Sequence, residues 1–523
     1  MTVGARHFQM PLAGAGQRPR PDLVLFAAPV GLLAVLALLP GMLAPSLDAA
    51  VFSVVGERVA AGDLPYGDVF DHKPPGLYLL IAAAQLMPGS LTAWMTSWVL
   101  SVAAVVLTGV LVADTLRRLG WGRIAWFVGA LCVAELASFP LARGGGAGET
   151  VAVLPAVAAL RMVAMGPYNA RRHFAGGVLA GLAAAVTLQA VAVLLAVLVA
   201  AVVRQDRRTD SRSTIRPLGA LWIVVGAASV TAWLVALLGT AGATGAAVQA
   251  VVNYNRAFVS LGAFDDSMAA EALHALLVLS PLLIPALLGL PRTLRDPSLR
   301  PIALGSLAWL AGVCAAIIAQ GRLEVHYVTM LVPPLALLAT GGLSFGLPVM
   351  QTQVRATVVA GLIVAALLVF GLLSATETAM ALESRAAKAN HSRAIASWIG
   401  AHSQPGDSIF VWGNAPEVYL DANRPPASPY VYLLPLTTPG YVSEPIVEGM
   451  LADWTAAPPA VIIDAGSPSP GAAGAPPLLI QRPVSAGDGR TVDLLGPLRA
   501  FVQERYQLAA TIEGWPIYLP QEY

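Results

Sequence analysis

Residues 46–80 read SLDAAVFSVVGERVAAGDLPYGDVFDHKPPGLYLL. Within this stretch Val51, Val55 and Val59 recur every four residues, while Glu57 and Arg58 fall elsewhere on the helical wheel. This spacing predicts a short amphipathic helix of the kind that lies along a membrane interface.

The second half of the same stretch predicts a turn followed by a stiff, extended approach to a second short helix. Gly62 and Pro65 end the first helix, and the pair Pro74-Pro75 restricts the backbone just before the next apolar segment. That segment, residues 76–88, is too short to cross a bilayer. We therefore expect it to lie in the interface or to re-enter the membrane.

The composition of the whole chain indicates a membrane protein. Of the 523 residues, 57% are hydrophobic and 12% are charged, and the mean hydropathy is +0.70. Soluble domains carry roughly 25% charged residues, which cover a water-facing surface. The net charge is +1, and no basic stretch is interleaved with aromatic residues, which excludes a nucleic-acid-binding protein.

Apolar runs on both sides of residues 46–80 predict about eleven transmembrane helices. A spanning helix needs about 20 apolar residues. Residues 174–203 are too long for one span and suit two short helices that meet near Gln189. The other nine runs are 23–43, 91–116, 122–141, 149–165, 218–240, 271–290, 301–319, 327–346 and 354–375.

The basic loops predict the orientation, because cytoplasmic loops are rich in Lys and Arg. The basic segments are the N-terminus and residues 117–123, 161–172, 204–216 and 292–300. With eleven spans, all of them fall on one side. We therefore expect a cytoplasmic tail at 1–22, a transmembrane domain at 23–375 whose first outer loop is 44–90, and an outer domain at 376–523.

The composition changes after the last apolar run. Short apolar runs alternate with turn residues, which predicts a small extracytoplasmic α/β domain. The expected strands are 409–413, 460–464 and 517–519, and the expected helices are 383–401, 445–454 and 494–504.

The outer loops gather polar residues that have no evident role at a helix end. Polar side chains collected at one membrane face predict a functional site there, and ordinary solvated loops are the alternative. The candidates are Asp48, Asp71, His72, Lys73, Arg143, Glu149, Asn253, Tyr254, Arg256, Arg322, Glu324 and His326.

An Asp after the first helix, followed by GDLPYGDVFDHKPPGLYLL (62–80), resembles bacterial members of glycosyltransferase family 39. These enzymes belong to the GT-C superfamily and are related to protein O-mannosyltransferases and to the aminoarabinose transferase of lipid A. The further similar segments are ARGGGAGETVAVLPAVAAL (142–160), GVLAGLAAAVTLQ (177–189), VVNYNRAFV (251–259), GRLEVHYVTMLVPPLALLA (321–339) and IFVWGNAPEVYLDANRPPASPYVY (409–432).

The resemblance implies a membrane glycosyltransferase with a polyprenyl-phosphate-linked sugar as its donor. The acceptor, a glycan, a lipid or a protein, is then expected outside the bacterial cytoplasmic membrane, and the first outer loop forms part of the active site. The resemblance implies no cofactor and leaves a divalent metal open. Ala49 stands where relatives often have a second acid, which argues against a carboxylate pair that holds a metal.

Two residues receive specific roles from the resemblance. Asp48 matches the carboxylate that accepts the acceptor proton; its alternative role is to cap a helix that begins at Ala49. Lys73 is expected to bind the donor phosphate, and its alternative is to extend toward the lipid headgroups.

The remaining candidates have less specific roles. Arg322 and His326 are expected to add positive contacts to the phosphate, and Asp71 and His72 to orient Lys73 or touch the sugar. Structural ion pairing between loops is the alternative for the charged residues among Arg143, Glu149, Arg322, Glu324 and His326. The expected substrate contacts are Glu149, Arg143 and Glu324, and the expected acceptor contacts are Asn253, Tyr254 and Arg256. Relatives often carry a Lys where this chain has Leu188 or Gln189.

Two other functions compete with glycosyl transfer. A lipid or solute transporter or flippase shares the polytopic topology, but such proteins place ionisable residues near mid-membrane. A non-catalytic, glycan-binding relative fits the missing second acid. If Asp48, Lys73 and residues 320–326 converge at one outward-facing site, this favours the enzyme over the transporter.

Overall fold

The computed structural model describes residues 21–166, 168–203, 215–260, 266–343, 353–466, 478, 484–485 and 491–521. The expected cytoplasmic tail at 1–22 lies outside the described residues except for its last two positions. Most of the expected basic loop 204–216 lies outside them as well.

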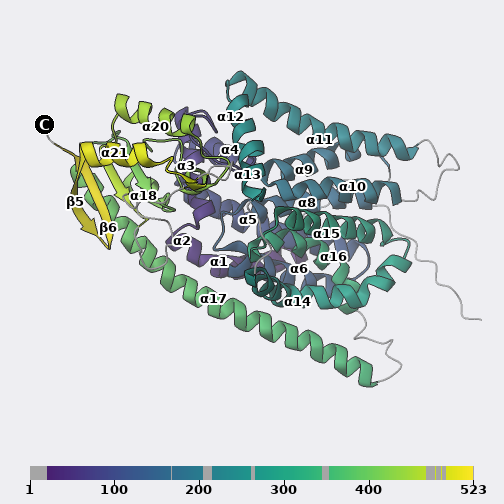
Figure 1. Ribbon diagram of the computed structural model, residues 1–523. Coiled ribbons are helices and arrows are strands. Elements are labelled where there is room, and N and C mark those ends of the chain that lie inside the picture. Colours follow the sequence, from purple (N-terminus) through teal and green to yellow (C-terminus); the bar gives the residue numbers. More distant parts are fainter. Residues whose placement is uncertain are drawn as a thin grey trace, which may run out of the picture.

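A bundle of helices occupies most of the molecule, and a small α/β unit caps one end of it (Figure 1). The bundle elements are α1 (Pro21–Ala37), α2 (Leu39–Leu43), α3 (Leu47–Ala61), α4 (Gly76–Gln85), α5 (Ala93–Arg118), α6 (Gly122–Ala137), α7 (Phe139–Ala142), α8 (Gly148–Met165), α9 (Ala170–Val186), η1 (Leu188–Ala190), α10 (Val191–Val203), α11 (Ile215–Thr240), α12 (Thr244–Val248), η2 (Gln249–Tyr254), α13 (Asn255–Ser260), α14 (Asp266–Arg295), α15 (Arg300–Gln320), η3 (Val325–Leu331), α16 (Val332–Leu343) and α17 (Gln353–His402).

The helix lengths show a multi-pass membrane protein. In the described part of the chain, 7 helices are long and apolar enough to cross a membrane. They are Ala93–Arg118, Gly148–Met165, Leu218–Thr240, Met268–Arg295, Arg300–Gln320, Val325–Leu343 and Thr357–His402. Helices α1, α6, α9 and α10 have 13 to 17 residues. Because they are shorter than a full span, the total of eleven stays a prediction.

The expected break near Gln189 is present. Helix α9 ends at Val186, and Thr187 is extended, with φ −146° and ψ 137°. The short 3₁₀-helix η1 follows, and α10 starts at Val191. Two short helices therefore replace one long one, as the length of the apolar run predicted.

The expected boundary between the transmembrane and outer domains, near residue 376, falls inside helix α17. The predicted span 354–375 and the predicted helix 383–401 form one helix of 50 residues. The reason is local, since residues 372–399 contain neither Gly nor Pro to interrupt a helix. In Figure 1 this helix runs along the bundle and leads directly into the α/β unit.

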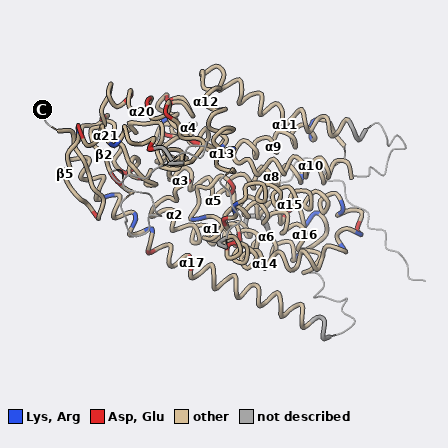
Figure 2. Tube along the Cα trace, viewed as in Figure 1, with Lys and Arg blue, Asp and Glu red and all other residues tan. Residues whose placement is uncertain are grey.

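Basic side chains from separate loops meet at one end of the bundle. Arg118 lies 2.8 Å from Asp114, and Arg161 of α8 pairs with the same carboxylate. The guanidinium of Arg292, at the end of α14, lies over the Trp121 ring. Figure 2 shows basic positions near the ends of α10, α15 and α16 away from the α/β unit, and many acidic positions around α4 and α20 (Glu444–Ala456). Within the described residues, the basic segments 117–123, 161–172 and 292–300 thus share an end.

Glycine lets the loop after α7 pack closely against α2 and α3. A Cβ at Gly41 would lie 1.9 Å from the carbonyl oxygen of Gly144. Gly146 has φ +85°, and a Cβ there would lie 2.4 Å from that of Ala49. Since Ala49 follows Asp48, this contact fixes where the first turn of α3 lies.

The C-terminal unit is built on a four-stranded sheet in the order β1-β2-β6-β5. Its strands are β1 (Ile409–Trp412), β2 (Val461–Asp464), β5 (Tyr506–Ile512) and β6 (Trp515–Pro520), and a separate pair is formed by β3 (Val484–Ser485) and β4 (Thr491–Val492). Strands β1 and β2 are parallel, and the other pairs in the larger sheet are antiparallel. The helices of the unit are α18 (Glu417–Ala422), α19 (Leu434–Thr437), α20 (Glu444–Ala456) and α21 (Gly496–Arg505).

Alternating side chains bury both faces of this sheet. Phe410 and Ile462 belong to one cluster with Trp454 of α20, whereas Val411 and Ile463 belong to the cluster that includes Ile399 of α17. The strands expected at 409–413, 460–464 and 517–519 are confirmed as β1, β2 and β6. Strand β5 was missed because it is largely exposed and reads YQLAATI, without an apolar run.

We expect Gly146→Ala to destabilise the protein. A non-glycine residue in the left-handed region costs roughly 1–2 kcal/mol, and the new Cβ also meets Ala49. Thermal unfolding of the purified protein, followed by tryptophan fluorescence, measures the effect. The control is Gly371→Ala on α17, where no atom lies within 4 Å of the new Cβ. Equal unfolding temperatures for the two variants would contradict the packing described for Gly146.

Candidate active site

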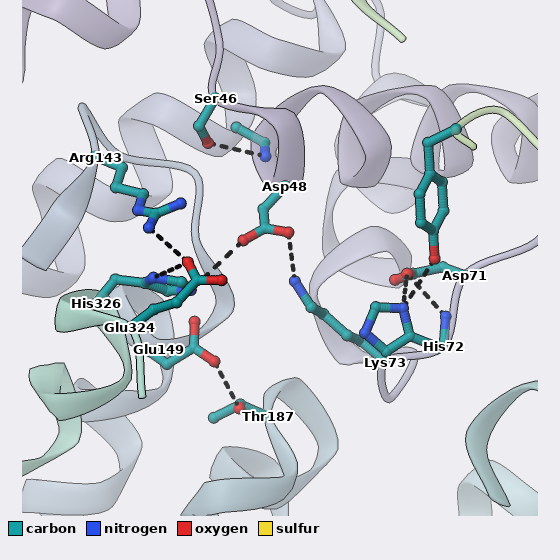
Figure 3. A network of polar contacts seen from close by, with 12 residues as sticks. Ser46, Asp48, Asp71, His72, Lys73, Arg143, Glu149, Thr187, Glu324 and His326 are labelled. Atoms are coloured by element: carbon teal, nitrogen blue, oxygen red, sulfur yellow. Dashed lines mark hydrogen bonds and ion pairs between the residues drawn. The ribbon is translucent and has the colours of Figure 1, made fainter. Parts of the chain in front are cut away.

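Asp48 lies in the first turn of α3 with its carboxylate directed away from the helix backbone toward Lys73 (Figure 3). Helix α3 begins at Leu47, and Ser46 caps it by accepting a hydrogen bond from the Ala49 amide at 3.2 Å. The alternative role of Asp48 as the cap of a helix that begins at Ala49 is therefore wrong. A carboxylate in a first helical turn is also favoured by the helix dipole.

Lys73 is held on a fixed backbone opposite Asp48. Its carbonyl oxygen accepts hydrogen bonds from the hydroxyls of Tyr66 at 3.0 Å and Tyr78 at 3.4 Å. Its Nζ lies 2.7 Å from Asp48 Oδ1 and 4.8 Å from the centre of the Phe52 ring. The ammonium thus turns inward to a carboxylate, and does not extend toward headgroups.

The two charges stabilise each other despite their burial. Burial alone would raise the pKa of Asp48, but the Lys73 ammonium, followed by His326, holds that pKa well below its usual range. Burial alone would lower the pKa of Lys73, but the carboxylates of Asp48, Glu149 and Asp71 raise it above its usual range. Both groups are therefore ionised at neutral pH.

A second set of side chains continues from Asp48 on the side away from Lys73 (Figure 3). His326 Nε2 lies 3.9 Å from Asp48 Oδ2, and its Nδ1 lies 3.3 Å from Glu324 Oε2. The same oxygen of Glu324 lies 2.6 Å from Arg143 Nη2. Arg143, Glu324 and His326 thus form one line of contacts that ends at Asp48. The Arg143–Glu324 ion pair joins two loops, as the structural alternative expects, so a substrate role for these residues stays a prediction.

Glu149 lies in the first turn of α8 beside the same site. Its Oε1 accepts a hydrogen bond from Thr187 Oγ1 at 3.0 Å, in a buried position. Thr187 immediately precedes Leu188 and Gln189, the positions where relatives often carry a Lys. The tip between α9 and α10 therefore reaches the site, and here it supplies a hydroxyl to Glu149.

Asp71 and His72 form the other wall of the site. The His72 backbone amide donates to Asp71 Oδ1 at 2.8 Å, while Asp71 Oδ2 has no hydrogen-bond partner among the described residues. Burial raises the pKa of Asp71 to about 6, against the opposing effect of Lys73. Burial, with Lys73, lowers the pKa of His72 to about 3, so its imidazole is neutral.

The C-terminal unit contributes a residue that the sequence did not reveal. Tyr432 places its hydroxyl 2.8 Å from His72 Nδ1, across 360 positions of sequence. The Phe70 amide donates to the Pro429 carbonyl at 2.8 Å, and Asn255 Nδ2 donates to the His72 carbonyl at 2.8 Å. Tyr432 stands in an apolar run, and no local signal distinguishes it from a core tyrosine.

Four expected residues lie outside this set of contacts. The Arg322 guanidinium lies 4.4 Å from the centre of the Phe258 ring. Asn253 donates to Gln249 at 2.7 Å, Tyr254 is buried beside Thr438, and Arg256 is exposed. Tyr254 and Phe258 belong to an aromatic cluster beside His72, with ring centres 5.0 and 6.3 Å from that of the imidazole.

The space between the walls of the site is small. A cavity of about 30 Å³ is lined by Asp48, Lys73 and Tyr432, together with Leu47, Val51, Phe52, Asp71, His72 and Leu434. It has room for roughly one water molecule. In the described part of the chain, no group of three or more His, Cys, Asp or Glu side chains is placed to hold a metal.

Comparison with known proteins gives likeness in structure only. No protein-family model and no curated protein matches the sequence at a significant level. ArnT from Cupriavidus metallidurans, solved bound to undecaprenyl phosphate and in the apo state, is similar in both forms, with a TM-score of 0.57 and 13% sequence identity. Each match covers 95% of this chain and 97% of ArnT. A weaker likeness, with a TM-score of 0.48 and 12% identity, is to the oligosaccharyltransferase AglB from Archaeoglobus fulgidus, over 85% of this chain and 69% of that one.

ArnT is a lipid A aminoarabinose transferase of the GT-C superfamily. The resemblance read from residues 62–80 is thereby confirmed at the level of the superfamily fold, while membership of family 39 stays a prediction. Over nearly its whole length, this chain has the GT-C fold of ArnT.

Proposed function

We propose that this chain is a membrane glycosyltransferase that moves a sugar from a polyprenyl-phosphate donor to an acceptor outside the bacterial cytoplasmic membrane. Asp48 is the base and Lys73 binds the donor phosphate. The observation that carries the proposal is the 2.7 Å contact between these two half-buried side chains in a GT-C fold. ArnT, which has this fold, has been solved bound to undecaprenyl phosphate, and this supports a lipid phosphate as part of the donor.

The reaction needs both groups. An acceptor hydroxyl attacks the anomeric carbon, the bond from that carbon to the phosphate oxygen breaks, and polyprenyl phosphate leaves with one additional negative charge. Lys73 offsets that charge as it develops. The hydroxyl proton passes to the Asp48 carboxylate. Arg143 and His326 lie on the far side of Asp48 from Lys73. Burial lowers the pKa of His326 to about 3, so its imidazole is a neutral polar group and not a positive contact.

Donor binding also changes the basicity of Asp48, because Asp48 is paired with Lys73 in the empty enzyme. The cavity of about 30 Å³ between the walls is smaller than a phosphate, and in the proposed mechanism Asp48 and Lys73 separate when the donor enters. The phosphate then pairs with the Lys73 ammonium, and Asp48 loses the partner that holds its pKa low. Its affinity for a proton rises, and it becomes a stronger base in the donor complex than in the empty enzyme.

We assign the membrane orientation from the two ends of the bundle. The end with Arg118, Arg161 and Arg292 faces the cytoplasm by the positive-inside rule, so the N-terminus is cytoplasmic. The Asp48–Lys73 site and the α/β unit within residues 376–523 are then extracytoplasmic. Convergence of Asp48, Lys73 and His326 at one end favours this enzyme over a transporter, which needs charged groups near mid-membrane.

We expect Asp48→Asn and Lys73→Met to fail in different ways. Loss of a general base lowers the rate by roughly a hundredfold or more, so Asp48→Asn should release little polyprenyl phosphate from a polyprenyl-phosphate sugar. Its binding of polyprenyl phosphate should equal or exceed that of the parent, because Lys73 has lost its competitor. Lys73→Met should lose this binding. Turnover and polyprenyl-phosphate binding are both measured on purified variants whose thermal unfolding matches that of the parent.

The matched controls come from a second ion pair in the same outer loop. Arg58 and Asp63 lie 2.6 Å apart and outside the site, so Asp63→Asn and Arg58→Met should keep both binding and turnover. Full turnover by Asp48→Asn would remove it as the base. Unchanged phosphate binding by Lys73→Met would remove it as the phosphate ligand.

We expect donor affinity to depend on pH through Asp71. Its raised pKa of about 6 means that the carboxyl is neutral below that pH and negative above it, close to Lys73. A phosphodiester donor keeps one negative charge throughout this range. Its affinity should therefore fall by roughly fivefold as pH rises from 5 to 7, which corresponds to about 1 kcal/mol of repulsion.

The variant Asp71→Asn should bind the donor equally at both pH values. Asp68→Asn, an exposed position in the same loop, is its control and should keep the pH dependence of the parent. A parent protein whose donor affinity is constant between pH 5 and 7 would show that Asp71 does not act on the phosphate.

A further inference from the structure

A larger cleft lies next to the proposed active site. Its volume is about 630 Å³, which falls within the range of roughly 300–1,000 Å³ typical of small-molecule sites. The first outer loop, the segment around η2 and the C-terminal unit each form one wall. Among the described residues that line it, none carries a formal charge; the principal ones are Tyr66, Phe70, Gln249, Asn253, Tyr430 and Tyr441.

Aromatic rings in two layers form one side of the cleft. Phe70 and Tyr254 are buried, with 2% and 0% of their surface exposed. The half-buried rings of Tyr430 and Tyr441 rest on them, with centres 5.3 and 5.7 Å from that of Phe70, and Tyr441 meets Tyr254 edge-on at 5.0 Å. The inner layer therefore holds the two outer rings in place while they contribute to the lining.

Two exposed amides also line the cleft. Asn253 Nδ2 donates to Gln249 Oε1 at 2.7 Å. That bond orients both groups and leaves the Gln249 amide nitrogen as a donor and the Asn253 oxygen as an acceptor for a bound molecule. Both side chains are on η2, a π-helical turn of a kind that often occurs at functional sites.

We propose that this cleft binds the saccharide part of a neutral glycan acceptor. A sugar ring has an apolar C–H face, which packs on an aromatic ring, and a rim of hydroxyls, which pair with amides and phenols. The uncharged lining provides no ion pair for a phosphate or an acidic sugar. The inference rests on the proposed glycosyl transfer, for which it names the class of acceptor.

The position of the cleft supports this role. Phe70 lines the cleft and precedes Asp71, which lines the small cavity beside Asp48. Tyr430 lines the cleft, and Tyr432, two residues later, lines that same cavity. The two spaces are therefore neighbours along two separate segments, and a glycan in the cleft lies next to the site of transfer.

The test measures saccharide binding to the full-length protein in lipid nanodiscs without donor. The probes are maltotriose, cellotriose, mannotriose and an arabinose trisaccharide, and the method is saturation-transfer difference NMR. At least one should bind the parent protein. Tyr441→Ala should weaken that binding by roughly three- to tenfold, the effect of losing one aromatic contact. Tyr441→Phe should retain it, because the ring remains.

The matched control is Tyr168→Ala, another half-buried tyrosine, beside His173 and outside the cleft; it should bind as the parent does. Absence of binding by every saccharide overturns the inference, and so does full affinity in a folded Tyr441→Ala variant. Binding of a Ser/Thr-rich peptide in place of the saccharides, sensitive to Tyr441→Ala, also overturns it. Failure of the proposed function shows separately, as a parent protein that releases no polyprenyl phosphate from any donor.

Discussion

The half-buried ion pair between Asp48 and Lys73 is the interaction on which the proposed chemistry depends. Each of these two partly desolvated charges stabilises the ionised form of the other. An anionic lipid phosphate is one of the few ligands that separates such a pair without leaving a charge uncompensated. In the proposed mechanism the pair therefore favours a phosphate ligand, and Asp48 becomes a strong base only when a phosphate has replaced it beside Lys73.

Several features of the fold hold the residues of this pair and their neighbours in place. Ser46 caps α3, so that Asp48 is not needed for that task. Two tyrosine hydroxyls and Pro74-Pro75 fix the backbone of Lys73. Gly146 allows close packing beside Asp48, and Tyr432 from the distant C-terminal unit restrains His72. Supports from four separate parts of the chain converge on one small volume, and this is the expected pattern for a preorganised site.

The sequence predicted the parts of this account that depend on local pattern. Apolar runs predicted the long helices, and the distribution of Lys and Arg predicted which of the described loops lie at the same end. Residues 46–80 identified Asp48 and Lys73 as candidate site residues. It did not reveal Tyr432 or the pairing of the cleft walls, because these depend on contacts between segments hundreds of residues apart. The assignment of Arg322 to the phosphate rested on charge alone, whereas the fold places its guanidinium over Phe258.

The most direct measurement is an experimental structure of the protein in nanodiscs with a polyprenyl-phosphate sugar or polyprenyl phosphate bound. We predict that the phosphate binds against Lys73 Nζ. The 2.7 Å contact to Asp48 is then open, and the Asp48 carboxylate is turned toward the cleft lined by Tyr441. A phosphate bound elsewhere, with the Asp48–Lys73 contact intact, would contradict it.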